Sequence, residues 1–162
     1  MFFGKKTPLP QVGARAPELR LRQLGGEEAA LADLLAAGPV LLAFFKVSCP
    51  VCQMTLPFLE RIHAGGGLQV YGVSQNDERD TRDFAGEYGL KFPMLLDSEH
   101  DGFPAGNAYG ITHVPTSFLV EADGTVGRLI EGWNKQEILW LGARSGVNPI
   151  GADDHVPEWK AG

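Results

Sequence analysis

Hydrophobic residues in this chain recur in two kinds of pattern. The run Val40–Phe45 is apolar at every position, which is typical of a strand buried on both faces of a sheet. Apolar residues between positions 51 and 62 then follow helical spacing, and the glycines at 65–67 end that pattern. Together the two patterns predict a buried strand that leads directly into a helix.

The rest of the chain alternates between short strands and helices. Strands are predicted at 18–22, 68–73, 92–96, 116–120 and 125–130, and helices at 31–35, 79–88, 104–109 and 135–143. The dipeptide Asp123-Gly124 lies between the last two strands, which predicts a β-hairpin. This order predicts an α/β domain in which helices cover a central sheet.

We interpret the chain as one domain with two appended segments. Residues 1–13 are predicted to form an N-terminal arm, residues 14–144 the domain, and residues 145–162 a polar C-terminal tail. The length of 162 residues and the hydrophobic share of 44% are those of one globular domain of ordinary size.

Charge and apolar patterning exclude some classes of function. The formal net charge of −6 argues against nucleic-acid binding, because contact with a phosphate backbone needs clustered cations. No run of 18 apolar residues occurs, so no membrane span is expected. The first eight residues lack the apolar core of an export signal. We therefore expect a cytoplasmic protein, or a periplasmic one if the given start is not the native start.

The two cysteines of the chain, Cys49 and Cys52, fall at the junction between the buried strand and the helix. A structural zinc site would need a second pair, and a disulfide scaffold would need more cysteines. Pro50 suits the first helical turn, where free backbone N–H groups and the helix dipole favour a thiolate at Cys49. Cys52 follows one turn later on the same face. The spacing predicts a redox pair in which Cys49 attacks and Cys52 resolves, and two inert core cysteines are the alternative.

Two segments of the sequence resemble the thioredoxin superfamily. Residues 44–57, FFKVSCPVCQMTLP, resemble its active-site segment, including Pro57 five residues after Cys52. Residues 111–116, ITHVPT, resemble its cis-proline loop. The N-terminal strand region and the insert at 75–109 are similar to the TlpA/ResA branch, which borders on the AhpC/TSA peroxiredoxins. The resemblance covers about residues 14–143.

This resemblance implies a thioredoxin-like fold: a central mixed β-sheet flanked by helices, with an N-terminal extension and a βα insert. It implies thiol–disulfide exchange with protein substrates and a redox partner, without a cofactor or metal. Pro115 would follow a cis peptide bond, and the backbone of Val114 would bind the substrate polypeptide beside Pro50 and Val51. Because no cation lies between the cysteines, we favour the reductase direction. We expect a monomer.

Two positions depart from the thioredoxin pattern. Ala43 stands where thioredoxins have an acid in the strand, and Ser48 replaces the usual Trp before the first cysteine. The acid normally helps to deprotonate the second thiol, so a base for Cys52 is missing or comes from elsewhere. Glu87 and Glu121 are candidates for that base.

A peroxiredoxin-type thiol peroxidase is one alternative function. The motif of that family resembles Pro-x-x-x-Thr-x-x-Cys, but here Lys46 holds the Thr position and Leu42 the Pro position. Arg128 is the candidate for a peroxide-binding arginine. Lys46 could instead support a Cys49 thiolate by its charge, or simply be solvated.

A Sco-like copper-binding chaperone is the second alternative. Two thiolates and an imidazole suit copper, and His113 lies two residues before Pro115. Sco proteins keep three residues between their cysteines, whereas two residues separate Cys49 from Cys52. The spacing therefore favours thiol–disulfide exchange.

Overall fold

A computed structural model of the chain describes residues 7–162, so residues 1–6 of the predicted arm lie outside the described part. The strands are β1 (Arg20–Gln23), β2 (Glu28–Ala30), β3 (Val40–Phe45), β4 (Gln69–Ser74), β5 (Met94–Leu96), β6 (Thr116–Val120), β7 (Val126–Glu131), β8 (Trp133–Asn134) and β9 (Trp159–Lys160). The helices are α1 (Leu31–Leu35), α2 (Pro50–Ala64), α3 (Glu78–Tyr88), α4 (Pro104–Ala108) and α5 (Lys135–Ser145), with a 3-10 turn η1 at Glu99–Asp101.

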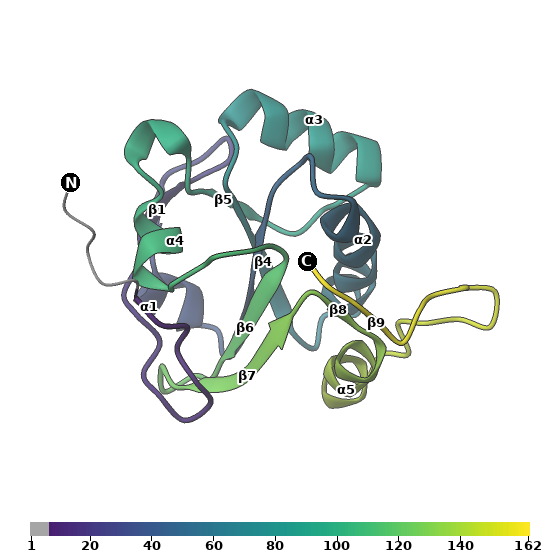
Figure 1. Ribbon diagram of the computed structural model, residues 1–162. Coiled ribbons are helices and arrows are strands. Elements are labelled where there is room, and N and C mark those ends of the chain that lie inside the picture. The colour runs from purple at the N-terminus through teal and green to yellow at the C-terminus, as the bar shows by residue number, and fades with distance from the viewer. Residues whose placement is uncertain (1–6) are drawn as a thin grey trace.

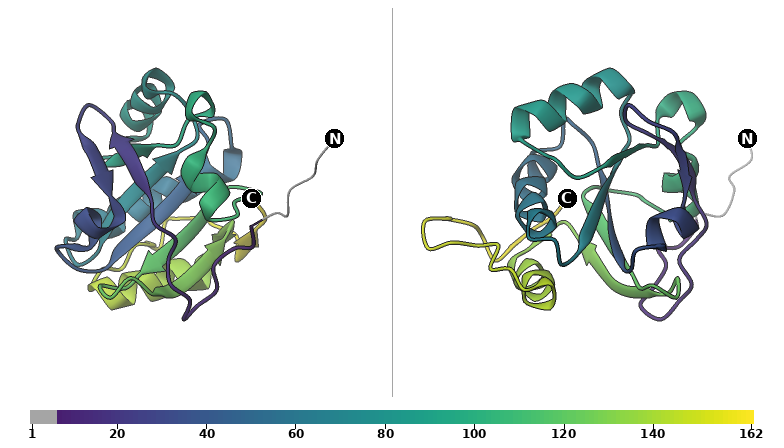
Figure 2. Two further views of the ribbon diagram at one scale, coloured as in Figure 1. Left: turned by 90° about the vertical axis from the view of Figure 1, so that its left-hand side faces the viewer. Right: turned by 180° about the vertical axis from the view of Figure 1, so that it is seen from behind.

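Seven strands form one mixed sheet in the order β2-β1-β5-β4-β3-β6-β7. The central strands β3, β4 and β5 run parallel, and the outer strands pair antiparallel. Helices α2, α3 and α5 lie on one side of this sheet, and α1 and α4 lie on the other (Figures 1 and 2). The α/β architecture predicted from the sequence is confirmed. Within residues 7–162, none of the helices is long and apolar enough to cross a membrane.

Strand β3 is covered on both faces, as its continuous apolar run predicts. All six of its residues are fully buried. Neighbouring side chains on the strand contact opposite layers: Phe44 packs against Tyr109, just after α4, and Phe45 stacks on Phe84 of α3. Strand β3 therefore forms the centre of the core, and its carboxyl end is a rigid base for the segment that follows.

The structure adds pairings that the sequence pattern did not predict. Strand β2 forms a hairpin with β1, and β9 in the predicted tail pairs antiparallel with β8. The tail returns to the domain through backbone contacts: Trp133 Nε1 donates to the Pro157 carbonyl at 2.6 Å, and the Lys135 N–H donates to the Glu158 carbonyl at 2.9 Å. Such contacts do not require an apolar repeat, so a polar segment can make them without a sequence signal.

Candidate active site

The cysteine pair lies where β3 ends and α2 begins. Cys49 is the N-cap of α2, in an extended conformation, and its Sγ accepts the backbone N–H of Cys52 at 3.1 Å. Pro50 occupies the first turn, where its missing N–H leaves no hydrogen bond unmade. Helix α2 continues through Pro57 to Ala64. The strand-to-helix junction predicted for the pair is confirmed.

The two thiols have different environments. Both cysteines are free, Cys49 is half-buried, and Cys52 is 0% exposed. Burial raises the pKa of the Cys52 thiol, and its hydrogen bond with Cys49 acts in the same direction. A hydrogen bond with the Lys46 backbone and, to a smaller extent, the charge of Lys46 act in the opposite direction and lower the pKa of Cys52. In the reduced protein Cys52 is therefore held as a neutral thiol.

The cis-proline loop lies against Cys49. The peptide bond between Val114 and Pro115 is cis, as the resemblance implies. The Cys49 thiol donates to the Val114 carbonyl oxygen at 3.5 Å. Pairing of Phe44 on β3 with Thr116 on β6 brings the two segments together, because β6 is antiparallel to β3 and begins beside the carboxyl end of β3. Cys49, Cys52, Val114 and Pro115 thus form one site.

Two side-chain amides hold the loop between β3 and α2. Asn76 Oδ1 accepts the backbone N–H of Val47 at 3.0 Å, and Gln53 Nε2 donates to the Val47 carbonyl at 2.9 Å. Neither Asn76 nor Gln53 belongs to a motif that marks it as a site residue in the sequence. Their only signal is position, since Gln53 follows Cys52 directly and Asn76 lies just beyond β4.

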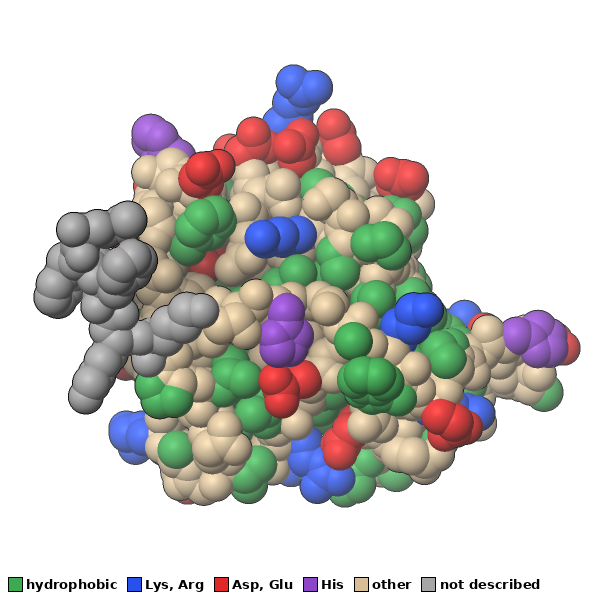
Figure 3. All heavy atoms as spheres, viewed as in Figure 1, with side chains coloured by type: hydrophobic (Ala, Val, Ile, Leu, Met, Phe, Trp, Pro, Cys, Tyr) green, Lys and Arg blue, Asp and Glu red, His purple; other side chains and the backbone are tan. Residues whose placement is uncertain are grey.

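Neither candidate base takes the place of the missing acid at Ala43, which is fully buried in β3. Glu121 lies just beyond the end of β6 opposite Pro115 and pairs with Arg144 at 2.7 Å. Glu87 lies on α3 and lines a hollow together with Val47, Gln53, Asp80 and Asp83. Acidic side chains gather over α3 in Figure 3. Within residues 7–162, the groups that shift the pKa of Cys52 are Cys49 and Lys46, not a carboxylate.

The residues considered for the alternative functions have other partners. Arg128 pairs with Glu137 at 2.7 Å and lies over the ring of Trp140 at 3.9 Å. The two ring nitrogens of His113 lie 3.0 Å from Thr112 Oγ1 and 3.4 Å from a carboxylate oxygen of Glu131. Within the described part of the chain, no three His, Cys, Asp or Glu side chains group closely enough to hold a metal ion.

Known proteins resemble the chain in sequence and in fold. The model of the AhpC/TSA family matches residues 12–128. Thiol-disulfide oxidoreductase ResA of Geobacillus thermodenitrificans is 31% identical over 140 residues, which cover 84% of this chain and 78% of ResA. The thioredoxin domain of a thiol-disulfide oxidoreductase from Bacteroides vulgatus has a TM-score of 0.72 at 23% identity, covering 85% of this chain and 99% of that domain. A thiol:disulfide interchange protein from Bacteroides sp. has a TM-score of 0.70 at 24% identity, covering 90% and 94% of the two chains. The two solved structures confirm the thioredoxin-like fold.

Proposed function

Because this chain belongs to the AhpC/TSA family and its ResA relatives are thiol-disulfide oxidoreductases, we propose that Cys49 and Cys52 exchange a dithiol for a disulfide with protein substrates. The observation that carries the proposal is the position of the Cys49 sulfur. It lies 3.1 Å from the backbone N–H of Cys52 and 3.5 Å from the Val114 carbonyl. A half-buried cysteine whose sulfur accepts a backbone N–H at a helix N-terminus suits a nucleophile.

In the reductive direction the Cys49 thiolate attacks one sulfur of a substrate disulfide. A mixed disulfide forms, and the other substrate sulfur leaves as a thiolate. Cys52 then loses its proton and attacks the Cys49 sulfur, which releases the second substrate thiolate. The substrate gains two electrons, and the protein retains a Cys49–Cys52 disulfide that an external dithiol reduces again. No bound cofactor takes part in this exchange.

The substrate polypeptide is proposed to pair in an extended form with the backbone of Val114. Such pairing supplies main-chain hydrogen bonds without requiring one particular substrate sequence. Pro115 fixes the position of this backbone, while exposed Pro50 and half-buried Val51 offer contacts beside the reacting sulfur. The substrate cysteine would then lie close to Cys49.

The reductase direction is supported by the environment of Cys52. A strong oxidant needs an unusually stable reduced form, which means stabilised thiolates. Burial raises the pKa of Cys52 and so disfavours its thiolate, and Pro50 and Val51 place no cation between the cysteines. A redox potential at the oxidising end of the thioredoxin-like range would contradict this direction.

A trapping experiment with insulin tests the assigned roles. In the Cys52→Ser variant the resolving thiol is absent, so a mixed disulfide between Cys49 and an insulin chain should accumulate and be visible by mass spectrometry. The matched Cys49→Ser variant should accumulate none, because Cys52 is fully buried. Stronger trapping by Cys49→Ser than by Cys52→Ser would reverse the two roles.

A second assay on the wild-type protein distinguishes peroxidase activity from thiol–disulfide exchange. The positions of the peroxidase motif hold fully buried Leu42 and exposed Lys46 instead of Pro and Thr. We expect insulin reduction with dithiothreitol to be faster than consumption of hydrogen peroxide with the same reductant. The reverse order would support the peroxidase alternative.

The monomeric state and the cytoplasmic location stay predictions. Light scattering of the purified protein measures the first. Fractionation of cells that express the natural gene measures the second.

A further inference from the structure

The last residues of the chain cross the proposed substrate-binding loop. We call Trp159–Gly162 the C-terminal strap. Its first two residues form β9, with Trp159 opposite Asn134 and Lys160 opposite Trp133. Figure 1 shows the yellow C-terminal end lying over the body of the molecule between β6 and α2. The strap therefore approaches the end of the sheet that carries the site.

Close backbone contacts seat the strap on this loop. A side chain at Gly162 would overlap the Val114 carbonyl and would lie 3.2 Å from the Pro115 nitrogen. On the other side, a side chain at Gly132 would overlap the Lys160 carbonyl and would lie 3.0 Å from the Gly162 nitrogen. Glycines thus stand at two points where the backbones are too close together for a side chain. Gly162 lies against the same carbonyl oxygen that the Cys49 thiol contacts.

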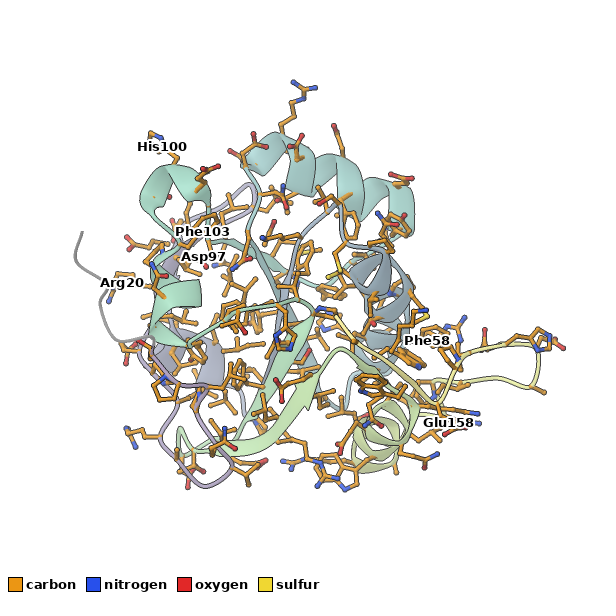
Figure 4. All side chains as sticks on the ribbon, viewed as in Figure 1. Arg20, Phe58, Asp97, His100, Phe103 and Glu158 are labelled. Carbon is orange, nitrogen blue, oxygen red and sulfur yellow. The ribbon has the colours of Figure 1, made fainter. Side chains whose placement is uncertain are left out.

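The strap is held by the residues that precede it and by the pairing of β9 with β8, and its own side chains bury little surface. Just before the strap, the carbonyls of Pro157 and Glu158 accept hydrogen bonds at 2.6 Å and 2.9 Å. Glu158 also contacts Lys135 and Gln136 of α5, beside which Figure 4 labels it. All four strap residues are exposed, including 61% of Trp159. Segments with so few buried contacts open at a small cost in free energy.

The strap borders an open hollow on the surface. The hollow has a volume of about 550 Å³ and is lined by His113, Glu131, Trp159, Ala161 and Gly162. The strap therefore rests on the loop through its backbone rather than through a packed apolar core, and it can leave without breaking such a core.

We propose that the C-terminal strap determines substrate specificity by covering the Val114 carbonyl. This inference rests on the proposed function, in which an extended substrate polypeptide pairs with that carbonyl. Gly162 and the substrate backbone need the same space, so the strap must move aside before a polypeptide binds. A small disulfide reacts at the Cys49 sulfur without this pairing. The strap thus disfavours polypeptide disulfides relative to small ones and leaves the chemistry at Cys49 unchanged.

Deletion of residues 159–162 tests the proposal and keeps the anchors at Pro157 and Glu158. The measurement is the second-order rate constant for oxidation of the reduced protein, first by insulin and then by hydroxyethyl disulfide. If the strap covers the Val114 carbonyl in most molecules, deleting it raises the rate constant for insulin by roughly fivefold to tenfold. The rate constant for hydroxyethyl disulfide should stay within about twofold, because the reaction at Cys49 is unchanged.

A full-length variant repeats the test without a deletion. Gly162→Val places a side chain against the Val114 carbonyl and should displace the strap, with the same selective gain for insulin. Gly151→Val is the matched control: it lies in the same tail, and the nearest atom to its added side chain belongs to Asp154 at 3.4 Å. This control should behave as the wild type does with both disulfides.

The outcomes separate the strap from the redox function. An unchanged or lowered rate constant for insulin in both strap variants overturns the proposal and leaves the proposed function intact. An equal gain for both disulfides also overturns it, because the strap would then shield the sulfur and not the carbonyl. If neither disulfide oxidises the wild-type protein, the proposed function fails and the strap proposal fails with it.

Discussion

The Cys49 sulfur lies 3.5 Å from the carbonyl oxygen of Val114, although 65 positions separate the two residues. Their proximity follows from the sheet, because β3 pairs with β6 and Phe44 lies opposite Thr116. Thr116 also closes the loop itself, since its Oγ1 donates to the His113 carbonyl at 2.9 Å. A buried strand residue thus contributes a hydrogen bond to the loop that carries Val114.

Replacing this hydroxyl should loosen the loop without changing its bulk. Thr116→Val removes the hydrogen bond to the His113 carbonyl, and we expect it to lower the free energy of unfolding by about 1 kcal/mol. It should also slow insulin reduction more than oxidation by hydroxyethyl disulfide, because only the polypeptide uses Val114. Urea unfolding and the two rate constants are the measurements.

The control for this variant is Thr125→Val. Thr125 makes a comparable hydrogen bond to Asp123 in an exposed hairpin turn. It should leave the ratio of the two rate constants unchanged. A Thr116→Val protein with the wild-type ratio would contradict a role for Thr116 in holding the substrate-binding loop.

The buried thiol of Cys52 predicts how the stability of the reduced protein depends on pH. Its folded pKa is raised above its ordinary value of 9.0, so the unfolded chain loses this proton first as pH rises. The free energy of unfolding should therefore be highest below pH 9.0 and fall above it, by up to about 1.4 kcal/mol per pH unit for this one group. Urea unfolding of the reduced protein across this range measures the slope.

Cys52→Ala isolates the contribution of this thiol. Other groups titrate in the same range, among them Tyr109, whose pKa burial also raises. These groups contribute equally to the slope of unfolding free energy against pH in both proteins. The difference in slope between the wild type and Cys52→Ala is therefore the contribution of Cys52. Equal slopes in the two proteins would show that Cys52 ionises equally in the folded and unfolded states.

Strands and helices with strong apolar periodicity could be predicted from the sequence, and segments held by backbone contacts could not. Burial of β3 on both faces follows from its six apolar residues, and α2 follows from its helical spacing and from Pro50 at its start. The tail carries no such period. Its return to the domain depends on the Trp133 indole and on Gly132, neither of which forms a local pattern with residues 157–162.

The candidate site likewise contains relationships that could be predicted from the sequence and others that could not. Cys49 and Cys52 are adjacent on one helix, so their relationship is local and visible in the sequence. The contact of Val114 with Cys49 is not local, and only the resemblance to thioredoxins pointed to it. Asn76 meets Val47 because two parallel strands end side by side, and a lone polar residue after a strand gives no hint of its partner.

The base of the strap offers a test that leaves the strap itself unchanged. Trp133→Phe removes the indole N–H that donates to the Pro157 carbonyl, and it keeps an aromatic ring against Phe58. We expect a loss of about 1 kcal/mol of stability. The rate constant for insulin should rise in the same direction as on strap deletion, but by less. A fall in the insulin rate constant at unchanged reactivity with hydroxyethyl disulfide would show that the anchored strap assists polypeptide binding.

The charge of Lys46 also acts on the resolving thiol. It lowers the pKa of Cys52 against the effect of burial, so Lys46→Met should raise that pKa further and reduce the thiolate available for the second step. Because Lys46 is exposed, the effect should be modest, with resolution slowed roughly twofold to fivefold. Rapid acid quenching followed by mass spectrometry should then show more mixed disulfide at early times than in the wild type.

Measurements at high ionic strength and on a variant of a second lysine test whether the effect of Lys46 on resolution is electrostatic. High ionic strength should slow resolution in the wild type and change Lys46→Met little, since an exposed charge is screened. Exposed Lys91 supplies the matched control, and Lys91→Met should resolve at the wild-type rate. If Lys46→Met resolves as fast as Lys91→Met, the lysine is merely solvated. Cys52 would then lose its proton through the departing substrate thiolate, which is the base that the exchange itself brings to the site.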